Sequence, residues 1–182
     1  AKAQHAAEIS IRPSGICGGV KKPSIYHHPL HDPSVSTIDY ALGLPTLAEE
    51  EKLFLAFSIG LSDGAKLTNR EDGVAFSVQL NGESIFRQAH RKNEWAAHAI
   101  DISSYAGKPT TLTLAVDSLK NSSYDWAVWG EPAIFKLSPP GFPPRKKGPV
   151  SGVILAKRPA HETRTLMVND QRHLVQPAND SD

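Results

Sequence analysis

Apolar and polar residues alternate with a period of two along much of the chain between residues 53 and 135. The clearest case is residues 53–61, where Leu53, Leu55, Phe57, Ile59 and Leu61 all fall on one face. Such alternation predicts a β-strand with one side against a core. A helical period of 3.6 is absent, apart from one acidic turn at most in residues 47–52. The pattern therefore predicts an all-β protein.

Two further segments repeat this alternation, and the strongest turn signal of the chain follows the first of them. Residues 74–80 point Val, Phe, Val and Leu to one side, and residues 112–116 do the same with Leu, Leu and Val. Asn81-Gly82 follows the first of them, and both residues tolerate the positive φ of a type I′ hairpin turn. Short strands at this spacing predict an antiparallel β-sandwich.

The remaining elements are expected from weaker patterns. We expect further strands at residues 9–12, 36–44, 84–88 and 95–102, and a turn over residues 103–108 that Gly107 closes. Residues 14–20, which contain three glycines, are expected to form a loop. Residues 21–33, with three prolines and three histidines, are expected to be irregular.

Residues 121–135 contain two of the three tryptophans. Tyr124, Trp126 and Val128 alternate with Asp125, Ala127 and Trp129, the pattern of a strand with one side against the core. This reading places Trp126 on the inward face. The pattern leaves open whether Trp95 and Trp129 belong to the core or to a binding surface.

The order of these motifs resembles the C-terminal half of a galactose-binding-like jelly roll. Within that class it resembles the NPCBM domain, a carbohydrate-binding module family attached to glycoside hydrolases. The resemblance covers roughly residues 50 to 135 and rests on residues 73–78, Asn81-Gly82, Ile100-Asp101-Ile102, residues 112–116 and Asp125-Trp126-Ala127. The segment before the last motif departs from the family pattern, since Ser122-Ser123-Tyr124 stands where the family is usually rich in Asp and His.

Three parts of the chain are expected on composition. Residues 1–137 form the β-sandwich module, and residues 138–149, with five prolines, form a Pro-rich linker. Residues 150–182 form a C-terminal extension that the resemblance does not cover. Apolar runs predict extra strands at residues 150–156 and 164–168.

Composition and charge limit the kinds of partner and the cellular location expected for this protein. A formal net charge of +1 gives no reason to expect a nucleic-acid partner, and no run of 18 apolar residues predicts a membrane span. Cys17 is the one cysteine, so no intrachain disulfide is expected, and a buried thiol is a better reading of it than a nucleophile. The start Ala1-Lys2-Ala3-Gln4 is compatible with signal cleavage or with a chain boundary. We expect an extracytoplasmic or secreted module with neighbouring domains as partners.

Sugar sites need aromatic faces for the C–H side of the ring and planar polar groups for its hydroxyls. In this fold class the resemblance implies that the ligand loops sit at one end of the sandwich. Residues 26–32, 87–95 and 121–124 are the expected loops that hold suitable side chains. The predicted ligand-binding residues are Arg87, His90, Asn93, Trp95, Asn121 and Tyr124.

The residue types offer two candidate metal sites, one for zinc and one for calcium. His27, His28, His31 and Asp32 offer zinc ligands, but their close spacing around Pro29 matches no known ligand pattern, so a solvated loop is expected. A structural calcium is the better candidate because related jelly rolls often hold one through loop oxygens. The available oxygens for calcium are those of Asp63, Asp72 and Glu131.

No catalytic motif is recognisable. Cys17 has no identifiable histidine partner, and neither a Gly-x-Ser-x-Gly elbow nor a phosphate-binding loop is present. The sequence therefore predicts a non-catalytic carbohydrate-binding accessory module of an exported multidomain protein. The alternative is a structural or protein-interaction spacer module with no sugar ligand. A binding module is expected to expose at least two aromatic side chains beside planar polar groups, whereas a spacer is expected to bury all three tryptophans.

Overall fold

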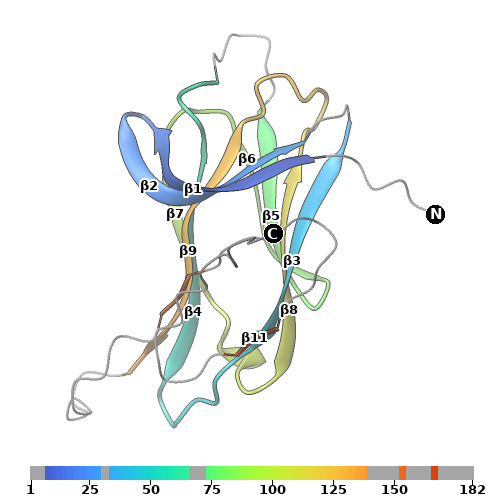
Figure 1. Ribbon diagram of the computed structural model, residues 1–182. Helices are drawn as coiled ribbons and strands as arrows, with labels where there is room; N and C mark the ends of the chain where they lie inside the picture. Colours follow the sequence, from blue (N-terminus) through green and yellow to red (C-terminus); the bar gives the residue numbers. More distant parts are fainter. Residues whose placement is uncertain (1–6, 30–32, 66–72, 139–151, 155–164, 168–182) are drawn as a thin grey trace, which may run out of the picture.

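Two β-sheets pack face to face in the computed structural model, which describes residues 7–29, 33–65, 73–138, 152–154 and 165–167 (Figure 1). The strands are β1 (Ala7–Cys17), β2 (Val20–Pro29), β3 (Val35–Gly43), β4 (Lys52–Leu61), β5 (Val74–Leu80), β6 (Glu83–His90), β7 (Ala96–Asp101), β8 (Pro109–Asp117), β9 (Ala127–Leu137), β10 (Gly152–Ile154) and β11 (Thr165–Met167). One 3₁₀ turn, η1 (Ser103–Tyr105), precedes β8. Among the described residues no helix is long and apolar enough to cross a membrane.

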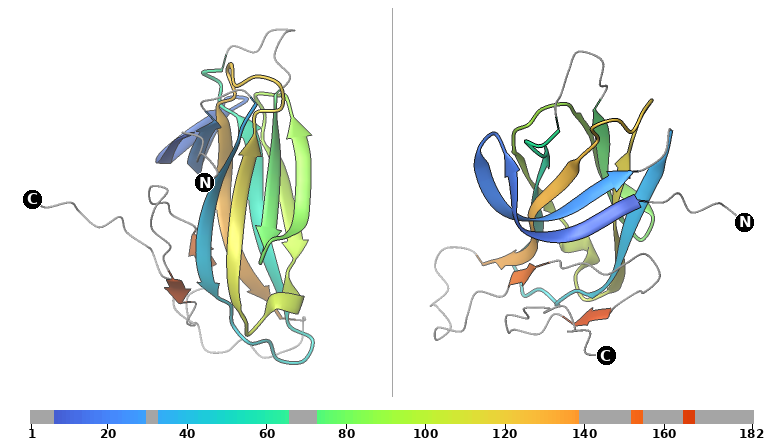
Figure 2. Two further views of the ribbon diagram at one scale, coloured as in Figure 1. Left: turned by 90° about the vertical axis from the view of Figure 1, so that its right-hand side faces the viewer. Right: turned by 45° about the horizontal axis from the view of Figure 1, so that its top comes forward.

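The order of the strands is that of a jelly-roll sandwich. Sheet A has the order β1-β2-β9-β4-β7, with β10 also paired to β9, and sheet B has the order β11-β3-β8-β5-β6. The chain passes from one sheet to the other at most connections. Figure 1 shows the two sheets edge-on, whereas the left view of Figure 2 looks onto sheet B. The predicted all-β sandwich of jelly-roll type is confirmed. One pair departs from the antiparallel prediction, because β11 runs parallel to β3.

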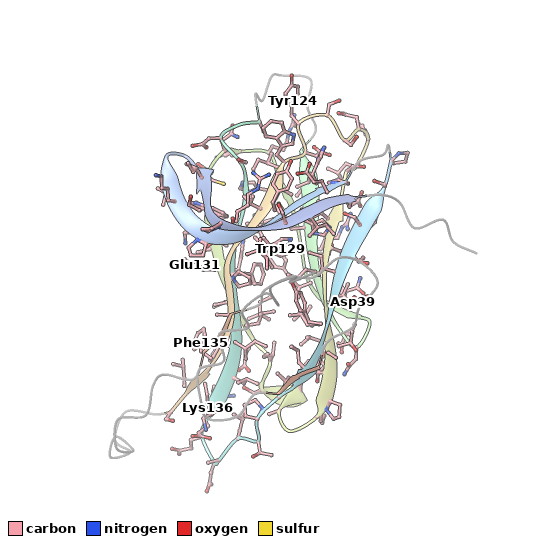
Figure 3. The ribbon with its side chains drawn as sticks, viewed as in Figure 1. Asp39, Tyr124, Trp129, Glu131, Phe135 and Lys136 are labelled. Carbon is pink, nitrogen blue, oxygen red and sulfur yellow. The ribbon has the colours of Figure 1, made fainter. Side chains whose placement is uncertain are left out.

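The core lies between the sheets and is built from the predicted alternating segments. All five inward residues of β4 are buried, and so are the inward residues of β5 and β8. Trp129 of β9 is fully buried at the centre, in edge-to-face contact with Phe57 (5.5 Å) and Phe76 (4.9 Å) (Figure 3). Such aromatic contacts add to the area that each ring buries.

The predicted turns are present where the sequence places them. Asn81 and Gly82 have φ values of 52° and 83°, as a type I′ turn requires, and they join β5 to β6. Gly107 has a φ of 70° and closes the connection from η1 to β8.

The first hairpin corrects the prediction for residues 14–29. Instead of loop and irregular chain, β1 and β2 form a long antiparallel pair joined at Gly18 and Gly19, whose φ values are 57° and 74°. A register shift between Arg12 and Gly15 marks a bulge that includes Pro13. The pairing of β1 with β2 continues on both sides of this bulge. Because β1 is an edge strand, a proline beside a bulge is tolerated there.

The orientation of the Trp126 segment was also predicted wrongly. Residues 121–126 are not extended, because the amides of Trp126 and Ala127 donate to carbonyls two residues earlier, at 2.7 and 2.8 Å. Strand β9 begins only at Ala127, so its odd-numbered residues Ala127 and Trp129 face the core. Trp126 is half-buried and packs on the other side of sheet A.

A small second cluster covers the outer side of sheet A. Cys17, Tyr26 and Val128 are buried there, with Trp95 and Trp126 packed against them. Gly60 lies beneath the cluster, since a Cβ at this position would lie 2.7 Å from Cys17 Sγ. The cluster therefore holds the β1–β2 hairpin against β4 and β9.

The described parts of the C-terminal extension add one strand to each sheet. β10 pairs with the lower half of β9, and β11 pairs with the end of β3. Both lie inside segments for which apolar runs predict strands. Residues 139–151, which include most of the predicted linker, lie outside the described residues.

Candidate functional site: an aromatic loop end

One end of the sandwich gathers the β8–β9 connection, the β6–β7 connection and the turn after β4 (Figure 1). Backbone hydrogen bonds join these segments: Ser62 N donates to Trp126 O (2.9 Å) and Leu61 N to Lys92 O (3.2 Å). The tip of the β1–β2 hairpin reaches the same end, where both oxygens of Asp63 accept from Gly18 N and Gly19 N. The loops at this end therefore form one connected surface.

Tyr124 stands at the outermost point of this surface (Figure 3). Its side chain is 40% exposed, and its backbone has a φ of 61°, in the left-handed region. A bulky residue in that region costs about 1–3 kcal/mol and persists only where the surroundings enforce it. Such strain is frequently found at ligand-binding positions.

Trp126 lies next to Tyr124 and forms the second half of an aromatic pair. The two ring centroids are 6.3 Å apart with an interplanar angle of 46°. The indole rests against Gly64, because a Cβ at that glycine would lie 2.5 Å from Trp126 Cζ3. A residue other than glycine at position 64 would displace the ring. The pair therefore presents two angled aromatic faces at the end of the sandwich.

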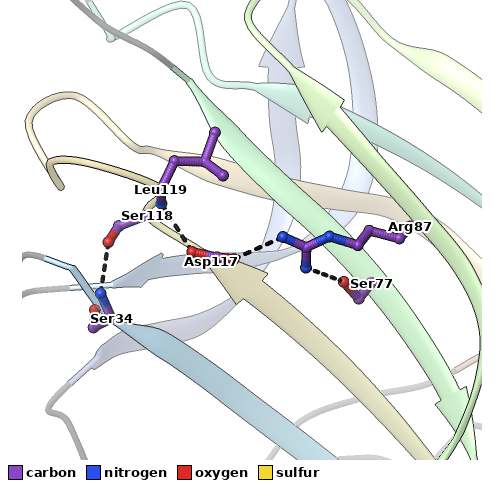
Figure 4. Close-up of polar contacts among 6 residues, drawn as sticks. All are labelled: Ser34, Ser77, Arg87, Asp117, Ser118 and Leu119. Carbon is purple, nitrogen blue, oxygen red and sulfur yellow. Dashed lines mark hydrogen bonds and ion pairs between the residues drawn. The ribbon is translucent and has the colours of Figure 1, made fainter.

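Side-chain hydrogen bonds fix where this loop begins (Figure 4). Asp117 accepts from Leu119 N (2.9 Å) and from Arg87 Nη2 (2.8 Å). Ser118 and Ser34 are joined twice, through Ser34 N to Ser118 Oγ (2.8 Å) and Ser118 N to Ser34 O (2.9 Å). Leu119 itself has a φ of 57°, so a second strained residue follows directly after the anchored strand end.

The end of the loop is held by β2. His28 Nδ1 donates to the carbonyl oxygen of Asp125 (3.0 Å), and the Asp125 side chain is buried. The His28 ring is half-buried and lies 6.3 Å from the ring of Tyr26. This brings an imidazole and a phenol ring to the same end of the sandwich as Trp126.

Three of the predicted ligand-binding residues have side chains that bond to the protein itself. Asn93 Nδ2 donates to Ser62 O (2.7 Å), with longer contacts to Leu61 O and Ala65 O. His90 is buried and its Nε2 donates to Lys92 O (2.9 Å) and Glu94 O (3.1 Å). Arg87 lies on the outer face of sheet B, where it bonds Asp117 and Ser77. Direct contact of these three with a sugar stays a prediction.

Two of the other three predicted residues also bond to the protein itself. Asn121 Oδ1 accepts from Ser123 N (3.1 Å), an Asx turn within the Tyr124 loop. Trp95 is half-buried and its Nε1 donates to Val20 O (2.9 Å), on the outer face of sheet A. Of the six, the structure brings Asn121 and Tyr124 together on one loop and sets Trp95 and Arg87 on two different sheet faces.

The described part of the calcium prediction consists of Asp63 and Glu131. Asp63 accepts the two glycine amides of the first hairpin, and Glu131 pairs with Lys22 Nζ (3.0 Å). Asp72 lies outside the described residues, as do His31 and Asp32 of the histidine-rich segment. No group of three or more His, Cys, Asp or Glu side chains suited to a metal ion occurs in the described part of the chain. The calcium site stays a prediction.

Trp126 and His28 lie at this end of the sandwich but are not among the predicted ligand-binding residues. The alternation of Trp126 with Tyr124 and Val128 is typical of a strand, and it therefore predicts a core position for Trp126. The sequence places His28 within residues 26–32, an expected sugar-binding loop, whereas β2 continues through it to Pro29. The Ser122-Ser123 pair before Tyr124 was a usable signal for a turn, since serines favour turns over strands.

No family model matches the chain. An uncharacterised protein of Archaeoglobus fulgidus is 28% identical over 123 residues, which is 60% of this chain and 30% of that protein. The chain therefore spans less than a third of the length of this relative.

Two solved structures similar to the chain are carbohydrate-binding modules. The CBM51 module of Clostridium perfringens GH95, in complex with methyl-galactose, has a TM-score of 0.48 and 21% identity over 75% of this chain and 91% of that one. The tandem CBM51 modules of a family 98 glycoside hydrolase from Streptococcus pneumoniae have a TM-score of 0.46 and 13% identity over 72% and 37%. Because both TM-scores are below 0.5, the fold assignment rests on the strand order.

Proposed function

We propose that this protein is a non-catalytic carbohydrate-binding module whose sugar site is the aromatic end formed by Tyr124 and Trp126. The sugar ring stacks on the exposed Tyr124 face, and the edge of Trp126 bounds it on one side. Binding of this kind draws on aromatic contact area, with polar groups setting the orientation of the ligand. Asn121 and His28 are the planar polar residues beside this end.

A single observation carries the proposal: an exposed tyrosine is held in the left-handed backbone region next to a second aromatic ring. Stability does not explain an exposed tyrosine at this position. Burial of its ring would stabilise the fold, and glycine in its place would relieve the backbone strain. Two of the three tryptophans are also incompletely buried, contrary to what a spacer module would require. Both features support a binding surface rather than a purely structural end.

A glycan array on the purified chain tests the proposal. We expect the chain to retain a subset of neutral oligosaccharides, with dissociation constants of about 1 mM to 1 μM when measured in solution. The matched control is Tyr124→Asn, because asparagine accepts the left-handed backbone and lacks the ring. Equal retention by the two proteins would contradict the proposed site, and no retention by either would favour the spacer alternative.

The same proposal includes a role as an accessory module outside the cytoplasm. The motif resemblance in the sequence supports this part, since modules of the family are attached to glycoside hydrolases. Catalysis would then belong to neighbouring domains of a longer protein, and this module would keep them near a glycan.

A further inference from the structure

A second aromatic residue lies on the outer face of sheet A, away from the loop that carries Tyr124. Trp95 directly precedes β7 and its indole extends across the glycines of the next two strands. A Cβ at Gly60 of β4 would lie 3.2 Å from Trp95 Cε3, and a Cβ at Gly130 of β9 would lie 2.8 Å from Cζ3. The indole therefore lies on bare backbone, with Nε1 fixed by Val20 O.

The lysine nearest to this indole belongs to an ion pair. Lys22 Nζ lies 5.8 Å from the Trp95 ring centroid, and it donates to Glu131 Oε2 (3.0 Å) and Ser58 Oγ (3.1 Å). The Glu131 side chain is 56% exposed and that of Lys22 is 22% exposed. The carboxylate is thus the more accessible member of the pair, and Lys22 connects it to the aromatic ring.

Glu131 has a strained backbone conformation at a bulge in β9. Its φ is 49°, and it lies at a bulge, since Ala56 pairs with Ala133 while Ser58 pairs with Gly130. Bulges commonly re-aim a side chain next to a functional site. Glutamate is not favoured in the left-handed region, where glycine or asparagine would be less strained. The backbone conformation therefore does not explain why this residue is a glutamate. Figure 3 shows Glu131 on the opposite side of β9 from Trp129.

The surface next to the Trp95 ring carries short side chains. Ala97 of β7 is exposed and pairs with Ser58 of β4, so short side chains border the Trp95 ring on that side. A ligand lying on the sheet can then touch the ring and the Lys22–Glu131 pair at the same time. A carboxylate and an ammonium side by side match adjacent hydroxyl groups, which both donate and accept hydrogen bonds.

We propose that Trp95, Lys22 and Glu131 form a second sugar subsite, which takes neutral sugars that present two adjacent hydroxyls to the charged pair. The exposed Glu131 carboxylate repels anionic sugars, so uronic acids are excluded. The ligand class is that of the proposed function and rests on it, whereas the location is independent of Tyr124. Strand β9 links the two sites, since it begins at Ala127, directly after Trp126, and Gly130 beneath Trp95 follows roughly 10 Å along the strand at about 3.3 Å per residue. One oligosaccharide of a few units can therefore span both sites.

The three tryptophan indole N–H signals in a two-dimensional ¹H–¹⁵N spectrum report on the sites separately, after assignment with Trp95→Phe and Trp126→Phe. The probes are neutral methyl glycosides, their trisaccharides and a methyl glucuronide. We expect neutral probes to shift the Trp95 signal in the native chain and also in Tyr124→Asn. In Glu131→Gly, which removes the carboxylate and suits a positive φ, the Trp95 affinity should fall about tenfold or more. Glu131→Asn keeps a planar polar group and should restore part of it.

The outcomes separate this proposal from the proposed function. A Trp126 shift without a Trp95 shift overturns the second subsite and leaves the Tyr124 site standing. A Trp95 shift alone supports the second subsite and contradicts the first. Unchanged Trp95 affinity in Glu131→Gly, or equal binding of methyl glucuronide, overturns the role given to the charged pair. If no probe moves either signal, both sites are refuted.

Discussion

The guanidinium of Arg87 lies 2.8 Å from the carboxylate of Asp117 and bridges β6 to β8 across the intervening β5. It also donates to Ser77 Oγ of β5 (3.2 Å), so three strands of sheet B meet at one side chain (Figure 4). The other oxygen of Asp117 accepts from Leu119 N, at the start of the Tyr124 loop. Arg87 is thus connected to the candidate sugar site through Asp117.

We predict that Asp117→Ala is more destabilising than Arg87→Ala. The Arg87 side chain is 54% exposed, so loss of its ion pair should cost at most about 1 kcal/mol. Asp117→Ala also leaves the Leu119 amide without its acceptor, and should cost about 1–3 kcal/mol. Urea unfolding of both variants and of the double variant measures the coupling. If Arg87→Ala proves the more destabilising of the two, the anchoring role of Asp117 is wrong.

Trp129, rather than Trp126, should be the tryptophan on which stability depends. We predict a loss of about 3–5 kcal/mol for Trp129→Ala, because the side chain is fully buried between two phenylalanines. Trp126→Ala should cost about 1–2 kcal/mol, since the ring is only half-buried. Thermal or urea unfolding provides the comparison, and equal losses would contradict the assignment of the two faces.

Trp129→Phe offers a matched control for the same residue. Trp129 Nε1 is buried and has no hydrogen-bond partner among the described residues. An unsatisfied buried donor is costly, and phenylalanine removes it while keeping most of the ring. This variant should therefore be much closer to the native protein in stability than Trp129→Ala.

Stability should fall on mild acidification because of His90 and His98. Burial lowers the pKa of both, and the nearby His90 further lowers the pKa of His98. The unfolded chain takes up these protons near pH 6.5, whereas the folded protein takes them up only at lower pH. The unfolded state then binds more protons, so stability is fully present above about pH 6.5 and declines below it.

Melting temperatures measured across this range check the expectation. His98 lies between Phe57 and Phe86, with ring centroids 5.5 and 4.6 Å away, so His98→Phe fits the same surroundings. The variant should flatten part of the decline. A melting temperature that rises as the pH falls from about 7 to about 5.5 would show that the two histidines do not control this range.

The sequence predicted those parts of the fold where one face of a strand is buried. In β4, β5 and β8, a side chain on the wrong face would lose its burial, so the period of two is clear. The β1–β2 hairpin lacked this signal, because its strands are short of apolar residues and its bulge follows Pro13. Pairing at such an edge has no regular pattern of apolar residues.

The candidate site was only partly predictable for a related reason. Tyr124 was identified by residue type alone, but the tight turns at Trp126 and Ala127 shift the strand by one residue and exchange its faces. The sequence does not show whether Trp95 lies in the core or on the surface, because the glycines that accommodate its ring, Gly60 and Gly130, are far away in sequence. Contacts of this kind depend on the register of three strands.

Calorimetric titration of the intact chain and of Tyr124→Gly with the best oligosaccharide from the array tests the central claim most directly. Glycine relieves the left-handed strain, so the free energy of unfolding should stay within about 1 kcal/mol of the native value. The account predicts binding between about 1 mM and 1 μM for the native chain and at least a roughly tenfold loss for the variant. Unchanged affinity in a folded Tyr124→Gly protein, or no heat from the native chain with any glycan of a broad panel, would contradict it.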